Sequence, residues 1–458
     1  MYRRVAIIGG GAAAAALLSE LLDRQLPQPL HVDWYTGGGT PARGVAYGTR
    51  SDRHLLNVRA ASMSMFVARP QGFLEFAQRG DSSIAGTDFL PRRLYGDYLE
   101  AEVDRALTRA RSAGHDVRVL PVTVDAVVPE NNGVTVVHGE ESSHVDASVL
   151  AIGSLPPQPL GGVSDAALES GLYVTEPWSF LGSVKPDPRP RKVVLIGLGL
   201  TAVDVLLELS ALWPNATFEA ISRHGLLPEP HLHMASAPSD DSGDLIESMR
   251  DAPDIRTWIR LLREAIAQSA DWRTVIDSLR PHTPSLWALL PPAERSRFLR
   301  HARWAWERVR HRMAPQVMTA LQQLEHEGRL HRRRGRLQAV DTVDGKLRLD
   351  VRLPHGKGIE TMDADLVIQT VGLNTDVRRT QHPLARQLAT NGHITPDPLG
   401  LGCIATKEGR LQHDDQVWPH FYAIGTLLRG TLWESTAMPE IRQQARNLAD
   451  RLLQPQLV

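Results

Sequence analysis

Short apolar runs next to glycines mark two places in the chain where a strand is expected to turn into a helix. Residues 5–8 (VAII) are uninterruptedly apolar, and residues 12–22 continue at helix length with alanine and leucine. A short continuous apolar run beside glycine is typical of a strand buried in a parallel sheet. The same pattern returns at residues 193–196 (VVLI), followed by a helical pattern through Leu212. The sequence therefore predicts two strand–turn–helix units.

The glycines of the first unit have the spacing of a dinucleotide-binding turn. Gly9, Gly11 and Ala14 follow the pattern GxGxxA. The first glycine permits the tight turn, the second lets the backbone approach a pyrophosphate, and the small third residue keeps helix and strand close. The first helical amides then favour a phosphate. A secretory signal peptide is the alternative for residues 3–18, but such a segment does not need glycines in this register.

The second unit repeats this spacing with Gly197, Gly199 and Ala202. Its next strand, FEAISRHG, ends at Arg223, where an NAD-binding fold carries an acidic residue. An arginine at this place favours the 2′-phosphate of NADP, which an acid would repel. In the first unit the corresponding position is Thr36, which is expected to bind a ribose hydroxyl in place of the usual carboxylate.

Patterning along the rest of the chain divides it into two nucleotide domains. Two apolar segments, residues 146–159 and 363–374, are expected to be the exit strands, and the proline-rich residues 185–192 read as a linker. The expected fold is α/β with two Rossmann-like domains, the second of which carries a helical insertion. The expected boundaries are 1–184 and 360–458 for an FAD domain, 185–359 for an NAD(P)H domain, and 243–328 for the insertion.

Composition narrows the function classes. The chain has 458 residues, a formal charge of -1 and 42% hydrophobic residues, which favours neither nucleic acid nor a membrane as a partner. A single cysteine, Cys403, excludes an intrachain disulfide and a dithiol redox pair, and indicates a cytoplasmic protein. His231 and His233 have no visible third ligand, so no metal site is expected.

A set of motifs resembles a known family. The chain is similar to the FAD/NAD(P)-binding proteins with two dinucleotide-binding domains, which are distantly similar to flavin-dependent N-hydroxylating monooxygenases. The segments that carry the resemblance are GGG (9–11), GVAYGT, HLLNV, RRLYGDYL, LAIGSLPP, IGLGLTAVD, ISRHGLLP and GTLLRGTLWESTAMPEIRQQA.

The resemblance implies roles for individual residues. It places Gly9, Gly11 and Ala14 at the FAD pyrophosphate, Gly425 near the ribityl chain, and Asn57 and His54 beside the flavin ring. More distant flavoproteins carry an aspartate after the glycine equivalent to Gly425, and this chain has Thr426. The residues expected to bind NADPH are Gly197, Gly199, Thr201, Ser222 and Arg223.

The last helix adds a physical argument. A helix beginning at Pro439 has free first-turn amides that stabilise negative charge, as on a reduced flavin. Trp433 and Glu434, just before it, are further candidates for the flavin pocket.

These features together predict a flavoprotein in which NADPH reduces FAD. The reduced flavin would then react with dioxygen and hydroxylate a small substrate, in one version at nitrogen of an amine or amino acid. Two alternatives stay open: a reductase or oxidase that passes electrons to another acceptor, and a non-catalytic nucleotide-bound module. The arginine-rich stretch 291–313 is expected to be a solvated or salt-bridged face of the insertion, because glutamates interleave with the arginines.

Overall fold

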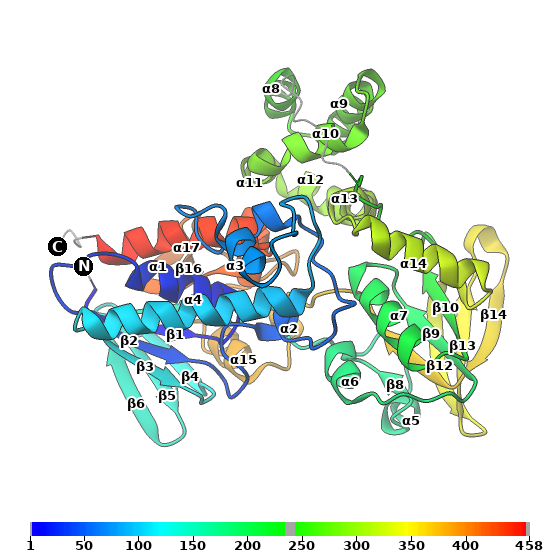
Figure 1. Cartoon of the computed structure of the whole chain (residues 1–458), viewed down its shortest axis with the longest axis horizontal. Coiled ribbons are helices and arrows are strands. Elements are labelled where there is room, and N and C mark those ends of the chain that lie inside the picture. Colours follow the sequence, from blue (N-terminus) through cyan, green and yellow to red (C-terminus); the bar gives the residue numbers. More distant parts are fainter. Residues whose placement is uncertain (1, 234–242, 455–458) are drawn as a thin grey trace.

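Two α/β units lie side by side, and a helical insertion covers the junction between them (Figure 1). The computed structural model describes residues 2–233 and 243–454. Both chain ends belong to the first unit, where the Tyr2 amide donates to the Leu452 carbonyl oxygen at 3.2 Å. None of the described helices has the length and apolarity needed to cross a membrane.

The first unit is built on a mainly parallel sheet with the order β16-β17-β7-β1-β2-β3. Only the β16–β17 pair is antiparallel within this sheet. A small antiparallel sheet, β4-β5-β6, packs on one face. The strands are β1 (Arg4–Ile8), β2 (His31–Tyr35), β3 (Asp116–Leu120), β4 (Ala126–Glu130), β5 (Gly133–His138), β6 (Glu141–Val145), β7 (Ala147–Leu150), β16 (Arg410–His413) and β17 (Gln416–Ala423).

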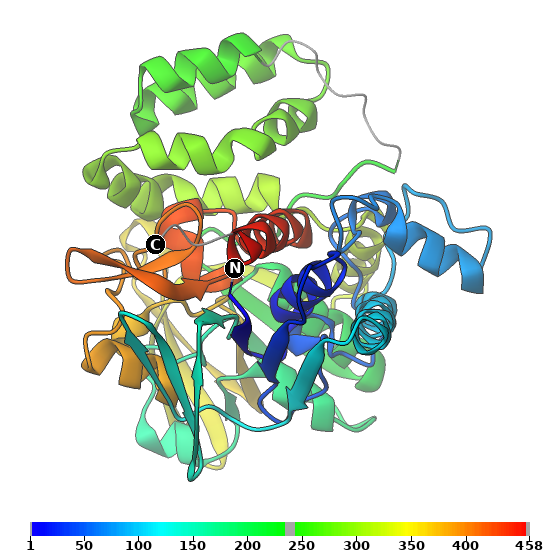
Figure 2. The ribbon, with the colours of Figure 1, turned by 90° about the vertical axis from the view of Figure 1, so that its left-hand side faces the viewer.

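Helices cover the other face of this sheet. Helices α1 and α17 lie side by side, with α4 next to α1 and the insertion on the outer side of α17 (Figure 2). Their apolar residues form one core with β1 and β2. The helices of the unit are α1 (Ala12–Leu22), α2 (Gly44–Tyr47), α3 (Gly72–Gly80), α4 (Arg92–Ser112), α15 (Pro383–Thr390), α16 (Arg429–Leu432) and α17 (Met438–Leu453).

The second unit repeats the plan with the parallel order β11-β10-β9-β15-β8. Helices α7 and α14 pack on one face of this sheet, and the antiparallel sheet β12-β13-β14 packs with α5 on the other. The elements are α5 (Asp165–Glu169), β8 (Tyr173–Val174), α6 (Pro177–Ser183), β9 (Arg191–Ile196), α7 (Leu200–Leu212), β10 (Ala216–Ser222), α14 (Pro315–His326), β11 (Leu330–Arg334), β12 (Arg336–Val343), β13 (Lys346–Arg352), β14 (Ile359–Ala364) and β15 (Leu366–Gln369).

Strand pairing and helix packing put the boundaries of the two units elsewhere than at the expected residues 184 and 360, and the end of the insertion elsewhere than at residue 328. Strand β8 pairs with β15, so α5, β8 and α6 belong to the second unit although they precede residue 184. Strands β14 and β15 also stay with the second unit beyond residue 360. Helix α14 packs on α7, so the insertion ends before it and not at residue 328.

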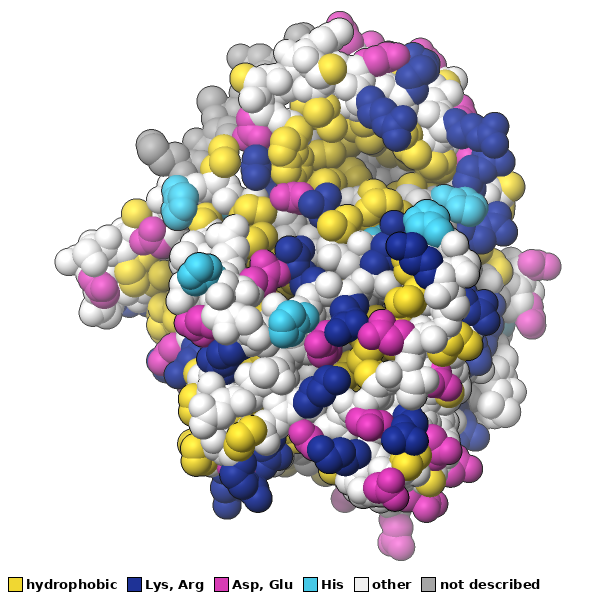
Figure 3. Space-filling model, turned by 90° about the vertical axis from the view of Figure 1, so that its right-hand side faces the viewer, with side chains coloured by type: hydrophobic (Ala, Val, Ile, Leu, Met, Phe, Trp, Pro, Cys, Tyr) yellow, Lys and Arg dark blue, Asp and Glu magenta, His cyan; other side chains and the backbone are white. Residues whose placement is uncertain are grey.

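The insertion has its own apolar core, which also takes up Trp433 from the first unit. Within the arginine-rich stretch 291–313, a π-helical turn at Phe298–Ala302 separates α12 from α13. On the face seen in Figure 3, hydrophobic side chains gather in a hollow of the insertion and basic side chains lie beside it. Its helices are α8 (Gly243–Asp251), α9 (Ile255–Gln268), α10 (Trp272–Ser278), α11 (Thr283–Leu289), α12 (Pro292–Arg297) and α13 (Arg303–Arg310).

Candidate functional site: two glycine turns and a cavity between the units

The first glycine turn leaves no room for a side chain. Gly9 follows β1 with a φ of +127°, in the region that favours glycine. A Cβ atom on it would lie 2.2 Å from the Ala151 carbonyl oxygen. Its amide donates to Tyr35 at 2.8 Å and its carbonyl oxygen accepts from the Trp34 indole at 2.8 Å. The turn is thus fixed against β2 and against the end of β7.

The second turn has the same geometry. Gly197 follows β9 with a φ of +116°, and a Cβ atom on it would lie 2.4 Å from the Thr370 carbonyl oxygen. Its amide donates to Ile221 at 2.8 Å, as that of the first turn does to β2. The Thr370 hydroxyl donates to the carbonyl oxygens of Ile196 and Gly197, both at 3.1 Å. Two turns of one design therefore stand at the carboxyl ends of the two parallel sheets.

Both turns open into helices whose first amides are not capped by a side chain. Gly11 is the N-cap residue of α1 and Gly199 that of α7. Ala14 and Ala202, one turn on, are fully buried, which lets each helix lie close to its sheet. No described protein atom lies within 4 Å of a Cβ placed on Gly199. Uncapped helix N-termini beside open space bind phosphate groups.

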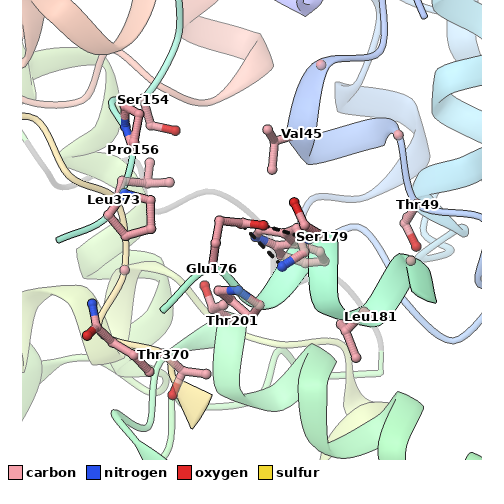
Figure 4. A pocket seen from close by; sticks show the side chains of 18 of the residues that line it. Val45, Thr49, Ser154, Pro156, Glu176, Ser179, Leu181, Thr201, Thr370 and Leu373 are labelled. Carbon is pink, nitrogen blue, oxygen red and sulfur yellow. Dashed lines mark hydrogen bonds between the residues drawn. The ribbon is translucent and has the colours of Figure 1, made fainter. Parts of the chain in front are cut away.

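A cavity of about 1320 Å³ lies between the two units. Its walls come from α2, the loop after α2 and the loop after β7 on one side, and from α6, α7 and the segment after β15 on the other. Figure 4 shows Val45 from the first unit across the cavity from Thr201 and Thr370 of the second. Val45, Val371 and Leu373 are at least half exposed. Such exposed apolar side chains in a cavity are suited to covering by a planar ring.

The expected ribose and ribityl residues converge on the first turn. A Cβ on Gly10 would lie 2.4 Å from the carbonyl oxygen of Thr36, which stands at the end of β2. Gly425 has a φ of +81°, and a Cβ atom placed on it would lie 3.6 Å from the Ala13 side chain. Thr426 follows it and is buried. The two sequence motifs are therefore neighbours in space although about 400 residues separate them.

A basic edge follows β10 in the second unit. The Ser222 hydroxyl accepts from the Gly225 amide at 2.9 Å, and Arg223 is exposed. Arg334 is opposite Ser222 in the parallel β10–β11 pair, and its Nε donates to the Arg223 carbonyl oxygen at 3.3 Å. The sequence analysis missed Arg334 because the HRRRGR run looked like ordinary surface. The signal that could have identified Arg334 is the order of α14 and β11: a strand directly after a helix pairs in parallel with β10, which places the end of β11 beside Ser222.

His54 is placed in the contact between the two units. It is 2% exposed, its Nδ1 lies 2.7 Å from the Thr49 hydroxyl, and its Nε2 lies 3.8 Å from Glu208 of α7. Its ring meets Trp178 of α6 edge-on at 5.7 Å. Burial lowers the pKa of His54, which favours the neutral ring. His54 also borders the cavity.

A buried ion pair accompanies this contact. Arg92, at the start of α4, pairs with Asp204 of α7 at 2.9 Å, and both side chains are mostly buried. Burial raises the pKa of Asp204, whereas the nearby Arg92 and His54 lower it. Arg92 also donates to the Leu55 carbonyl oxygen at 3.2 Å. Both residues lie in motifs that carry the resemblance, but the sequence did not predict their pairing, because only the tertiary fold brings α4 to α7.

The remaining flavin-pocket candidates meet the insertion or the segment that precedes it. The Asn57 carbonyl oxygen accepts from the His231 ring at 3.1 Å. Trp433 stacks on Trp287 of α11 at 4.8 Å between ring centres. Glu434 pairs with Arg310 at 2.8 Å, and both are buried.

A second cavity lies beside these contacts. It has a volume of about 550 Å³ and is lined by Glu434 and Pro439 of the first unit and by Arg280 of the insertion. Pro439 stands in the first turn of α17, whose N-terminus has no side-chain cap. Arg280 pairs with Glu440 at 2.6 Å across this cavity.

Two other chemistries find no support in the site. Cys403 is fully buried and burial raises its pKa to about 12, so its thiol is not a ready nucleophile at neutral pH. Within residues 2–233 and 243–454, no cluster of histidine, cysteine or acidic side chains could hold a metal ion.

Comparisons with known proteins agree with this architecture. Residues 6–155 match the family model described as FAD-NAD(P)-binding, which confirms the resemblance predicted from the motifs. No curated protein matches the chain in sequence.

Solved structures share the fold over nearly the whole chain. Ornithine N-hydroxylase of Kutzneria sp. 744 is 15% identical with a TM-score of 0.63, and the match covers 99% of each chain. L-lysine 6-monooxygenase from Pseudomonas syringae is 15% identical with a TM-score of 0.64, again over 99% of each chain. Bacillithiol disulfide reductase from Staphylococcus aureus is 13% identical with a TM-score of 0.56, over 98% of each chain. The predicted α/β fold with two Rossmann-like units is confirmed.

Proposed function

We propose that the chain is an FAD-dependent, NADPH-utilising oxidoreductase that hydroxylates a small substrate at nitrogen. The observation that carries the proposal is the pair of glycine turns of one geometry, at the carboxyl ends of two sheets that border a common cavity. In sheets of this type, ligands bind outside the carboxyl ends of the strands. A site for one nucleotide in each unit would bring two cofactors together.

The residues of the first turn fit FAD. The backbone at Gly9 excludes any side chain, and at Gly11 the nearest atom to an added Cβ is the Gly44 Cα at 3.7 Å. Gly9, Gly11 and Ala14 would hold the pyrophosphate, with Thr36 at the ribose and Gly425 and Thr426 at the ribityl chain.

The second turn fits NADPH. Gly197, Gly199 and Thr201 would hold its pyrophosphate, and Thr201 borders the cavity. Ser222 and Arg223 would bind the 2′-phosphate at the basic edge after β10. No acidic residue occupies the end of this strand, which favours NADPH over NADH.

FAD, when bound, supplies the redox chemistry: it takes electrons from NADPH and passes them to dioxygen for the hydroxylation. The chain would align the two rings, exclude water and stabilise negative charge on the reduced ring. The N-terminus of α17, which has no side-chain cap beside Pro439, suits the last task through the helix dipole. Asn57, His54, Trp433 and Glu434 stay our candidates for the flavin-side pocket.

Hydroxylation is favoured over the two alternatives by the structural comparison. The ornithine hydroxylase, whose structure is described with reduced FAD, NADP+ and L-ornithine, is more similar in fold than the disulfide reductase. A disulfide acceptor in this chain is also disfavoured because its single thiol is buried. We also propose a cytoplasmic location, because a chain with a single cysteine has no intrachain disulfide to maintain in an oxidising compartment.

A two-stage experiment tests the proposal. The purified protein is loaded with FAD and titrated with NADPH without oxygen, and the flavin absorbance is followed. Bleaching by NADPH is expected, and a protein that stays oxidised would exclude an oxidoreductase of this kind. Air is then admitted with a panel of amines and amino acids, and hydroxylamine products and hydrogen peroxide are measured. Substrate-dependent product supports a hydroxylase, whereas quantitative peroxide with every compound would identify an oxidase.

A further inference from the structure

The insertion reaches the basic edge after β10 through one aromatic pair. Trp304 of α13 stacks on His224, which directly follows Arg223, with 3.9 Å between ring centres and 19° between ring planes. Both residues are only half-buried. The Trp304 indole donates to the His301 carbonyl oxygen at 3.0 Å, so the N–H edge of the ring is already used. The pair therefore presents a flat aromatic surface at the end of β10.

Two arginines without acidic partners stand beside this surface. Among the residues that the structure describes, the Arg223 side chain makes no hydrogen bond or ion pair, and that of Arg334 donates only to the Arg223 carbonyl oxygen. Burial and both positive charges lower the pKa of His224, which favours the neutral ring. Arginine side chains bind phosphate groups, and bases stack on aromatic rings. Two uncompensated guanidinium groups beside a flat neutral surface are therefore suited to a phosphorylated nucleoside.

Helix α13 is fixed to the segment that follows this edge. The Arg308 guanidinium donates to the Leu227 carbonyl oxygen at 3.1 Å and pairs with Glu229. The Glu229 amide in turn donates to the Arg308 carbonyl oxygen at 3.0 Å. These bonds hold Trp304 over His224, so the aromatic surface is preorganised and a ligand on it would not have to order these side chains first.

The same helix is fixed to the first unit just before the start of α17. The Trp306 indole donates to the Glu434 carboxylate at 3.1 Å. Glu307 pairs with Arg429 of the first unit at 3.0 Å. Helix α13 therefore contacts the basic edge of the second unit through Trp304 and the proposed flavin side of the first unit through Trp306. A ligand on Trp304 would touch the insertion as well as the second unit.

We propose that the insertion takes part in nucleotide binding: the adenine ring of NADPH extends the stack of Trp304 and His224, and its 2′-phosphate lies between Arg223 and Arg334. The inference rests on the proposed function, which assigns NADPH to the second unit, and adds a contact from a helix outside that unit. Because α13 is also fixed to the first unit, a bound NADPH would join the two units through the insertion.

The experiment uses adenosine 2′,5′-bisphosphate, the part of NADPH that would lie at this edge. The FAD-loaded protein is titrated with it by calorimetry. We expect Trp304→Leu to weaken binding about tenfold to a hundredfold, as for one base stacked on an aromatic side chain, and Trp304→Phe, which keeps a smaller ring, to weaken it less. The advantage of NADPH over reduced nicotinamide mononucleotide as electron donor should shrink by a similar factor in Trp304→Leu, because the mononucleotide has no adenosine. A general loss of folding would instead affect both donors alike.

The matched control is Trp272→Leu, because Trp272 is another half-buried tryptophan of the insertion, in α10, where the Arg273 guanidinium lies 4.5 Å from its ring centre. It should bind the bisphosphate as tightly as the wild-type protein does. The inference is overturned if Trp304→Leu also binds as tightly as the wild-type protein, or if both leucine variants weaken binding equally. Reduction of the wild-type flavin by NADPH is measured in parallel. Absence of that reduction would contradict the proposed function, whereas unchanged binding in Trp304→Leu would contradict only the stacking surface.

Discussion

Replacing Gly199 by alanine separates nucleotide binding from folding. Gly199 has a φ of -81° and a ψ of -173°, which alanine adopts without strain, and an added Cβ meets no described protein atom within 4 Å. The free energy of unfolding should therefore change by less than about 1 kcal/mol. Binding of a pyrophosphate should be weakened, because the new methyl group would stand between the phosphate and the helix amides.

The expected loss follows from those amide contacts. A hydrogen bond to a charged group contributes about 1.5–3 kcal/mol, so losing one should weaken NADPH binding roughly tenfold to a hundredfold. The assay is the rate of flavin reduction against NADPH concentration, measured by rapid mixing without oxygen. FAD content should stay at the wild-type level, because the first turn is not touched.

Gly197→Ala is the matched control for this reasoning. Its Cβ would lie 2.4 Å from the Thr370 carbonyl oxygen and its φ is +116°, so it should destabilise the second unit by about 1–3 kcal/mol or more. If Gly199→Ala binds NADPH as tightly as the wild-type protein does, the pyrophosphate does not rest on α7. The assignment of the second turn to NADPH would then be refuted.

Three further predictions concern specificity, domain contact and pH. Arg223→Ala or Arg334→Ala should raise the KM for NADPH about tenfold and leave that for NADH unchanged; equal losses in steady-state assays would exclude a 2′-phosphate contact. Asp204→Asn should leave Arg92 unpaired, cost about 3 kcal/mol in urea unfolding and slow flavin reduction by NADPH, whereas an unchanged reduction rate would show that the pair does not align the units. Burial lowers the pKa of His231 to about 4, whereas the ordinary value near 6.5 applies to the unfolded chain. The neutral ring therefore contributes about 1–3 kcal/mol to the free energy of unfolding above pH 6.5, and this contribution should be lost as the pH falls toward 4. Urea unfolding at several pH values should show a smaller loss in His231→Gln, and an identical pH dependence would count against this role.

Local signals in the sequence predicted the turns because their physics is local. Gly9 and Gly197 are required by a backbone conformation and a close neighbour, both of which follow directly from a strand that turns into a helix. The proline in the first turn of α17 was predicted for the same reason. The expected boundary at residue 184 was wrong because β8 has only two residues, too few for a recognisable pattern. Its partner strand β15 lies almost 200 residues further along the chain.

The candidate site was predictable only where it follows the strands. Thr36 and Gly425 were placed by their position after a strand, and the structure brings both to the first turn. Trp433 and Glu434 were chosen for closeness to α17 in sequence, and both contact the insertion instead of standing alone beside the helix. Arg334 was missed because its role depends on register with Ser222, which no composition or spacing reveals.

The contacts of the insertion indicate which unit it moves with. Its chain leaves and re-enters the second unit, yet it is joined to the first unit by two ion pairs, the buried pair of Glu434 with Arg310 and the partly buried pair of Glu440 with Arg280. The Trp287 indole also donates to the Gly430 carbonyl oxygen at 2.7 Å. Breaking a buried ion pair by removing one partner costs about 3–5 kcal/mol, so separation of the insertion from the first unit is unfavourable. If the two units shift relative to each other during a reaction cycle, the insertion should stay with the first unit, the proposed FAD unit.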